Sequence, residues 1–259
     1  MMDTIFTNKS ARKLLLIAAS FAAVYGVSTP ANAFTIGSLN PDSAPGIHAN
    51  KAPYTVGITS ADVGKTFSTY WILKGATTTP LKAKAYFKVT DLTSSNLSLD
   101  TVLLNRTDDS FQAAITSLGL GVTPNANKFS FNPKGNIFKY GYVETGKQNF
   151  PGGYKDIDLC ITTSKSGNTS NCPGGNINNG LQAGDKDLFG INIGGKFGSN
   201  PTVTLQTLPI KFQTSQGSYE LLASKPREVP TPAATLGIIA FGAISAVSTL
   251  KRKSKSITE

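Results

Sequence analysis

The segment from Phe34 to Lys225 lacks any long run with the apolar spacing of an amphipathic helix. It contains instead about ten short runs rich in apolar, β-branched and aromatic residues, separated by turn-forming Gly, Pro, Asn and Asp. Apolar and polar residues alternate most clearly over Lys82–Thr90, where Ala83, Ala85 and Phe87 occupy every second position. This alternation is typical of a half-buried β-strand.

These runs predict an all-β fold, an antiparallel two-sheet sandwich, because no helices separate the strands as they would in a parallel sheet. The 25 Gly and 14 Pro, with only 15% charged residues, also argue against long helices. We expect a domain at residues 54–222, an N-terminal stretch at 34–53 and a linker at 223–232. The expected strands are Tyr54–Thr59, Thr66–Leu73, Lys82–Thr90, Asn96–Leu104, Gln112–Gly119, Ile137–Val143, Asp156–Thr162, Leu188–Ile193, Thr202–Leu208 and Ile210–Thr214.

Residues 1–33 have the three parts of a signal peptide. These parts are a basic segment, an apolar run and a small-x-small motif, found at Lys9, Arg12 and Lys13, at Leu14–Val24, and at Ala31–Ala33. The pattern predicts export through the Sec translocon and cleavage by signal peptidase between Ala33 and Phe34. A retained N-terminal anchor is the alternative, but the apolar run is short for a bilayer span.

A second apolar segment lies near the C-terminus. Ala233–Leu250 is 18 residues long and carries no charge, so as a helix it spans most of a hydrocarbon core about 30 Å thick. The cations Lys251, Arg252 and Lys253 follow it. They predict a transmembrane helix at 233–250 in the lipid bilayer, with a basic cytoplasmic tail at 251–259 and the domain outside the cytoplasm. A buried core helix is the alternative.

The segment Val229-Pro230-Thr231-Pro232, followed by this apolar run and the basic cluster Lys251-Arg252-Lys253, resembles the PEP-CTERM sorting signal of exported bacterial proteins. The resemblance implies that a membrane-embedded exosortase recognises and processes the tail. The protein would then be released or retained at the cell surface or in the extracellular matrix. The chain departs from the family at Thr231, where the family has Glu, so the tripeptide of the sorting signal is altered at its central residue.

The middle of the chain resembles the cistern family of PEP-CTERM proteins. The matching segments are Asp62–Phe67, Ala83–Phe87, Ile115–Leu120, Leu159–Ile161 and Asn171–Gly175. The resemblance covers most of residues 55–215 and implies an exported domain without an assigned activity.

Cys160 and Cys172 are the only cysteines, and export makes their oxidation available. We therefore predict a structural disulfide that closes the Thr/Ser/Gly/Asn-rich loop Thr162–Asn171. A metal site needs more ligands of suitable type, and a catalytic Cys–His pair would have to use His48, the only histidine.

The formal net charge of +10 is divided unevenly along the chain. The two end segments carry half of it, and from Phe34 to Lys225 there are 17 Lys or Arg against 12 Asp or Glu. No basic stripe interleaved with aromatics is evident, so we expect no nucleic-acid partner. A mildly basic exported domain favours anionic extracellular polysaccharide or envelope surfaces.

Two pairs of acids are the candidates for chemistry. Asp156 and Asp158 would share one strand face, and Asp185 and Asp187 lie beside a glycine. A glycosidase needs two carboxyl groups about 5 to 9.5 Å apart. A Ca²⁺ site needs several converging oxygens, and neither pair has the spacing of an EF-hand loop. Solvated turn and strand residues are the simpler interpretation. We predict no catalytic residue, metal or cofactor, with Ca²⁺ as the alternative.

The aromatic residues are more suggestive. Phe138, Tyr140 and Tyr142 alternate, and Phe150 and Tyr154 follow a Gly/Pro-rich bend. The tyrosines form either a ligand face for sugar rings or part of the core, and core packing is the stronger interpretation. The leading hypothesis is a non-enzymatic envelope or extracellular-matrix protein. A carbohydrate-binding or adhesive surface module and a secreted hydrolase are the alternatives.

Overall fold

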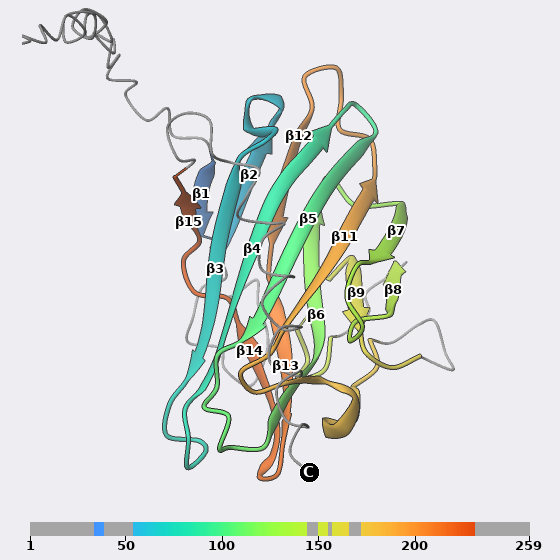
Figure 1. The fold of residues 1–259 in the computed structure, drawn as a ribbon. Coiled ribbons are helices and arrows are strands. Elements are labelled where there is room, and N and C mark those ends of the chain that lie inside the picture. The colour runs from blue at the N-terminus through green and yellow to red at the C-terminus, as the bar shows by residue number, and fades with distance from the viewer. Residues whose placement is uncertain (1–33, 39–53, 144–149, 155–156, 166–171, 231–259) are drawn as a thin grey trace, which may run out of the picture. The chain divides into compact units, whose positions relative to one another are not determined.

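The chain forms two antiparallel β-sheets packed face to face (Figure 1). The computed structural model describes residues 34–38, 54–143, 150–154, 157–165 and 172–230. One sheet contains, in order, β15 (Arg227–Val229), β3 (Thr66–Leu73), β4 (Leu81–Leu92), β5 (Asn96–Asn105), β11 (Lys186–Gly194) and β7 (Lys128–Pro133). Figure 1 looks onto the outer face of this six-stranded sheet.

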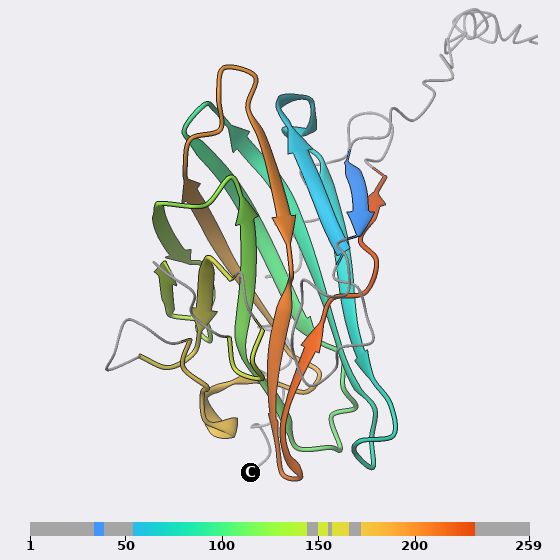
Figure 2. The ribbon, with the colours of Figure 1, turned by 180° about the vertical axis from the view of Figure 1, so that it is seen from behind.

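The second sheet has nine strands and is seen in front in Figure 2. Its centre is β6 (Ala113–Thr123), which pairs on one side with the two halves of a long broken strand, β12 (Thr202–Gln206) and β13 (Pro209–Thr214). The remaining members are β1 (Thr35–Ser38), β2 (Tyr54–Thr59), β8 (Tyr140–Val143), β9 (Leu159–Thr162), β10 (Leu181–Gln182) and β14 (Gly217–Leu222).

The break in the long strand fastens the two sheets together. Thr207 takes a positive φ of 46°, which is uncommon for a β-branched residue, and it separates β12 from β13. The next carbonyl, that of Leu208, accepts a hydrogen bond from the Trp71 indole N–H at 2.9 Å and from the Ala223 amide at 3.0 Å. Trp71 belongs to the opposite sheet, so this bond crosses the core.

Buried Asn105, at the end of β5, makes a second link between the sheets. Its side-chain amide donates to the Ala113 and Leu181 carbonyls, at 3.0 and 2.9 Å, and its side-chain oxygen accepts from the Thr107 amide at 3.1 Å. Because this polar side chain is fully satisfied, its burial fixes the relative position of the sheets.

Alternate residues of both sheets fill the main core. Phe67 and Phe87 stack within it, and Phe131 and Phe138 both pack on Phe189. The period-two pattern of β4 is borne out, because Ala83, Ala85 and Phe87 are buried while their neighbours are not.

Strand β6 departs from that pattern because it is covered on both faces, and every residue except Thr123 is buried. A Cβ on Gly119 would come within 2.8 Å of both Phe150 and Pro209, so only glycine allows this close approach. The covering layer forms a second, smaller core made of Phe150, Tyr154, Ile157, Cys160 and Cys172.

The predicted antiparallel two-sheet fold is confirmed, and all ten expected segments contain strand. The main differences lie at the ends of the domain. Phe34 is buried and packs edge-on against Phe67, and β1 pairs with β2. At the other end β15 pairs with β3, setting Glu228 opposite the same Phe67. Both segments that flank the expected domain at 54–222 therefore supply edge strands to the sheets.

These terminal strands, β1 and β15, lie side by side in both views (Figures 1 and 2). Among the described residues, no helix is both long and apolar enough to cross a membrane. The segments predicted as signal peptide (1–33) and transmembrane helix (233–250) lie outside those residues.

Candidate functional site

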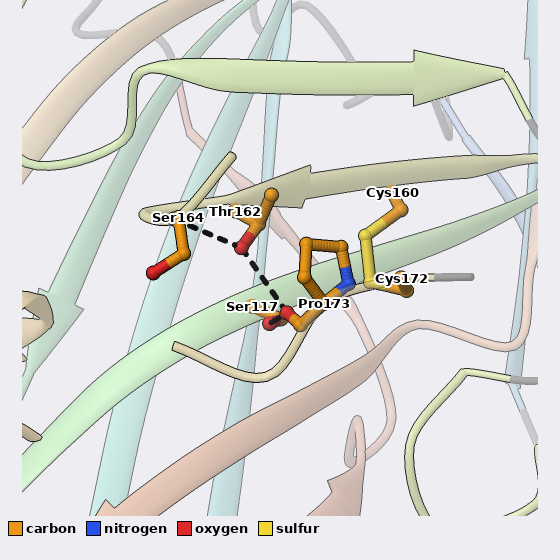
Figure 3. Close-up of a disulfide and its surroundings, with 6 residues drawn as sticks. All are labelled: Ser117, Cys160, Thr162, Ser164, Cys172 and Pro173. Atoms are coloured by element: carbon orange, nitrogen blue, oxygen red, sulfur yellow. Dashed lines mark hydrogen bonds between the residues drawn. A yellow bond between two sulfur atoms is a disulfide. The ribbon is translucent and has the colours of Figure 1, made fainter. Parts of the chain in front are cut away.

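The covering layer on the nine-stranded sheet holds the predicted disulfide and Tyr154. The predicted disulfide is confirmed, since Cys160 on β9 is bonded to Cys172 with their Cα atoms 5.5 Å apart (Figure 3). Both residues are buried. The bond therefore attaches the segment that begins at Cys172 to the outer face of the sheet.

A polar contact continues this attachment. The Pro173 carbonyl accepts hydrogen bonds from the Ser117 hydroxyl at 2.8 Å and from the Thr162 hydroxyl at 3.2 Å (Figure 3). Ser117 and Thr162 lie opposite each other on β6 and β9. Because the Ser117 hydroxyl is buried and donates to a carbonyl, it is placed as a structural group and not as a nucleophile.

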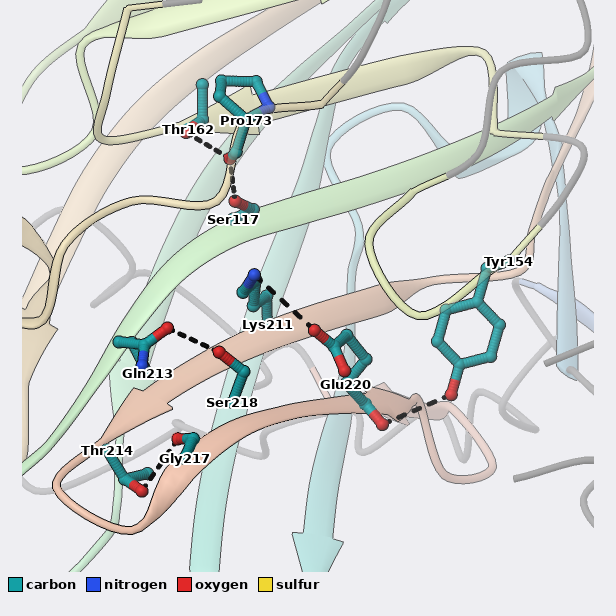
Figure 4. A network of polar contacts seen from close by, with 10 residues as sticks. All are labelled: Ser117, Tyr154, Thr162, Pro173, Lys211, Gln213, Thr214, Gly217, Ser218 and Glu220. Atoms are coloured by element: carbon teal, nitrogen blue, oxygen red, sulfur yellow. Dashed lines mark hydrogen bonds and ion pairs between the residues drawn. The ribbon is translucent and has the colours of Figure 1, made fainter. Parts of the chain in front are cut away.

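A second group of polar residues lies on β13 and β14 (Figure 4). The Lys211 ammonium is 3.7 Å from a Glu220 carboxylate oxygen, and both side chains are mostly buried. The Tyr154 hydroxyl donates to the Glu220 carbonyl at 3.3 Å. Burial, and then the nearby Glu220 charge, raise the pKa of Tyr154 to about 12, so this tyrosine stays neutral at physiological pH.

The three tyrosines of the expected ligand face do not share one surface. Tyr140 and Tyr142 lie on β8 opposite Thr162 and Cys160 and are half-buried. Tyr154 is only 1% exposed and belongs to the smaller core.

Phe138, expected on the same face as Tyr140 and Tyr142, is instead fully buried in the main core against Phe189. The strand begins only at Tyr140, so the alternation does not extend back to Phe138. Trp71 is also a core residue.

The acidic pair Asp185 and Asp187 is divided between two environments. Asp185 is exposed, whereas Asp187 is buried and its carboxylate accepts from the Phe138 amide at 2.7 Å and the Ile137 amide at 3.3 Å. Asp187 therefore anchors a turn. It is not one half of a solvent-facing acid pair.

The other acidic pair cannot be compared in the same way, because Asp156 lies outside the described residues. Its partner Asp158 accepts from the Val122 amide at 2.6 Å. Within the described part of the chain, no three His, Cys, Asp or Glu side chains gather as a metal site would require. His48 is also outside that part.

The predicted processing residues lie at or beyond the limits of the described chain. Phe34, Val229 and Pro230 are described, and Phe34 is a core residue. The other predicted residues, Ala31, Ala33, Thr231, Pro232, Lys251, Arg252 and Lys253, lie outside the described ranges.

One surface escaped the sequence interpretation. Lys82, Lys84, Tyr86 and Lys88 alternate with the buried residues of β4 and so share its outer face. The expectation that no basic stripe is interleaved with aromatics was therefore wrong. The two-residue spacing of these side chains indicates the stripe from the sequence. A count of charges along the whole chain does not reveal it.

No known protein family matches the chain, and no curated protein matches it. The crystal structure of the yeast GGA1 GAE domain-P21 is 11% identical over 62% of this chain and 99% of that chain, with a TM-score of 0.24. A structure of manganese lipoxygenase of Gaeumannomyces graminis with part of zonadhesin of Komagataella pastoris is 8% identical over 78% of this chain and 97% of that chain, with a TM-score of 0.16. Such low TM-scores support no conclusion about fold or function.

Proposed function

We propose that this chain is an exported, non-enzymatic β-sandwich protein of the bacterial envelope or extracellular matrix. Signal peptidase removes residues 1–33, and the helix at 233–250 holds the domain at the outer side of the inner membrane. An exosortase then acts on the tail at the Val229–Pro232 motif and leaves the domain at the cell surface or in the matrix.

The observation that carries this proposal is the agreement between the domain ends and the two predicted processing points. Phe34 packs on Phe67, so cleavage after Ala33 leaves the core complete, whereas cleavage a few residues later would remove a core aromatic. At the other end β15 stops at Val229, where the sorting motif begins. Both cuts therefore spare the sandwich.

The proposal that the protein is non-enzymatic is supported by the hydrogen bonds that its polar side chains make to the backbone. Asp158 and Asp187 accept hydrogen bonds from backbone amides, and Ser117 and Thr162 donate to a backbone carbonyl. A general acid or nucleophile needs free access to substrate. These groups have structural partners instead, which favours a binding or structural role.

The test is the intact mass and membrane partitioning of the protein from its native host, for the natural chain and for Thr231→Glu, which restores the family's tripeptide. We expect both chains to begin at Phe34. We expect a larger fraction of Thr231→Glu to lose the tail and to leave the detergent phase, because the sorting enzyme then meets its usual motif.

A matched control is Thr235→Glu, which adds the same charge to the apolar run but leaves the tripeptide altered. We expect the fraction of Thr235→Glu chains that lose the tail to be no larger than that of the natural chain. A protein that keeps residues 1–33, or that fractionates with the cytoplasm, would contradict the proposal.

A further inference from the structure

The outer face of the six-stranded sheet carries a cluster of cations and tyrosines. We define the basic face as Tyr70, Lys82, Lys84, Tyr86, Lys88 and Arg227. Strand register places these residues together, because Tyr70 lies opposite Lys84, and Arg227 lies opposite Ser68, which is itself opposite Tyr86. Directly paired residues of antiparallel strands project from the same side of a sheet.

The strands next to β4 extend this face, and the cations on it outnumber the acids. Lys84 is opposite Leu104, and Leu104 is opposite Lys186, which adds another exposed cation. Two acids share this face: Asp91, which is exposed and lies opposite Ser98, and Asp100, which lies opposite Lys88 and already forms an ion pair with Lys134. Lys82, Lys84 and Lys88 thus stand along one strand, at steps of about 7 Å per two residues.

The two sheets differ in what covers them. Residues 150–154 and 172–176 lie over the nine-stranded sheet, and the Lys211 ammonium there is balanced by Glu220. On the outer face of β4, Lys82 is exposed and Lys84, Tyr86 and Lys88 are half-buried. The side chains of the basic face are therefore at least partly accessible to solvent.

The tyrosines of this face already bind cations. The Lys84 ammonium lies 4.5 Å from the centre of the Tyr86 ring, and the Arg227 guanidinium lies 5.9 Å from the centre of the Tyr70 ring. These contacts fix the cations on rigid rings. They also cover one face of each ring, which disfavours the base stacking on which single-stranded nucleic acid binding depends.

We propose that the basic face binds an acidic polysaccharide. The proposal rests on the proposed export, since an exported domain meets envelope and matrix glycans. Carboxylate or sulfate groups repeated along such a chain match cations repeated along a strand, and many weak contacts add through avidity. Tyr86 and Tyr70 hold the Lys84 and Arg227 charges in place for these contacts.

The experiment measures binding of alginate, a polymer of uronic acids, to the full chain purified in a non-ionic detergent. The triple variant Lys82→Gln, Lys84→Gln and Lys88→Gln is compared with a control triple, Lys139→Gln, Lys165→Gln and Lys196→Gln. The control residues are exposed and lie off the basic face. Both variants lose the same net charge, so only the position of the charges differs.

We expect the natural chain and the control to bind alginate but not neutral dextran, with affinity falling as salt rises. The basic-face variant should bind roughly tenfold more weakly and with a shallower salt dependence, because three surface contacts are lost. Its melting temperature should match that of the natural chain, which separates loss of binding from loss of fold.

Three results would overturn the proposal: no alginate binding by the natural chain, equal weakening in both triple variants, or tighter binding of single-stranded DNA than of alginate. The first two remove the face as a site, and the third replaces the polysaccharide with a nucleic acid. The mass measurement tests export separately, so the two proposals can fail independently.

Discussion

At the scale of single residues, the most consequential side chain is the buried Asp187. Its carboxylate accepts two backbone amides, from Ile137 and Phe138, in the segment that leads from β7 to β8. A Cβ on Gly135 would reach the same carboxylate, at 1.6 Å from one oxygen. The close approach of this carboxylate therefore requires glycine at position 135.

We predict that Asp187→Ala lowers the free energy of unfolding by about 2–3 kcal/mol, because the buried Phe138 amide and the part-buried Ile137 amide both lose a charged acceptor. The matched control is Asp185→Ala, two residues away and exposed, which should change stability by less than about 0.5 kcal/mol. Urea unfolding followed by the fluorescence of Trp71, the single tryptophan, measures both. Equal effects of the two substitutions would show that the amide contacts do not stabilise the turn.

At the scale of elements, the sequence predicted the strands that have one face in the core and the other in solvent. Strand β4 was found because its buried and solvent-facing residues alternate. Strand β14 (Gly217–Leu222) was missed because its first half is exposed at an edge and carries little apolar signal. The edge strand β7 was missed for a similar reason, since no residue of Lys128–Pro133 is buried.

The covering layer could not be predicted from periodicity at all. Phe150 and Tyr154 lie in a turn with Gly152 and Gly153 at positive φ, and their burial depends on the small outer-face residue Gly119 of a distant strand. Nothing local to either segment shows that they meet. The cysteine pair was the one sequence feature that connected this layer to the sheet.

The next prediction concerns the disulfide. Reducing Cys160–Cys172 should lower the free energy of unfolding by about 3 kcal/mol, as expected for opening a closed loop of this size. Comparing oxidised and reduced protein of the same sequence keeps side-chain volume constant. The double variant Cys160→Ala and Cys172→Ala should be unaffected by the reductant, and a reductant effect on it would assign the loss to something other than this bond.

At the scale of the whole molecule, the sequence predicted two antiparallel sheets but not how the chain closes them. Strands β1 and β15 are only four and three residues long, too short for an alternating signal. They were assigned to the segments flanking the domain because turn-forming residues and targeting patterns surround them. These two short strands form by pairing with β2 and β3, and their own sequences do not indicate that pairing.

The last prediction concerns this closure. Phe34 is 6% exposed and packs edge-on against Phe67 at a ring separation of 5.2 Å, and Glu228 of β15 lies opposite Phe67 in the strand register. Phe34→Ala should lower the free energy of unfolding by about 3 kcal/mol through the cavity beside Phe67. Phe34→Leu, which keeps most of the volume, should cost under about 1.5 kcal/mol.

The same pair of variants tests whether the two chain ends are coupled. Because Phe34 and β15 both border Phe67, loss of the Phe34 ring should also speed amide hydrogen exchange at Arg227 and Val229. Thr202→Ala, an exposed change on β12, serves as the control and should leave exchange in β15 unchanged. If Phe34→Ala destabilises the domain but exchange in β15 follows only global unfolding, the ends close the sandwich independently. Faster local exchange would mean that the first residue of the proposed mature chain holds in place the strand that leads into the sorting tail.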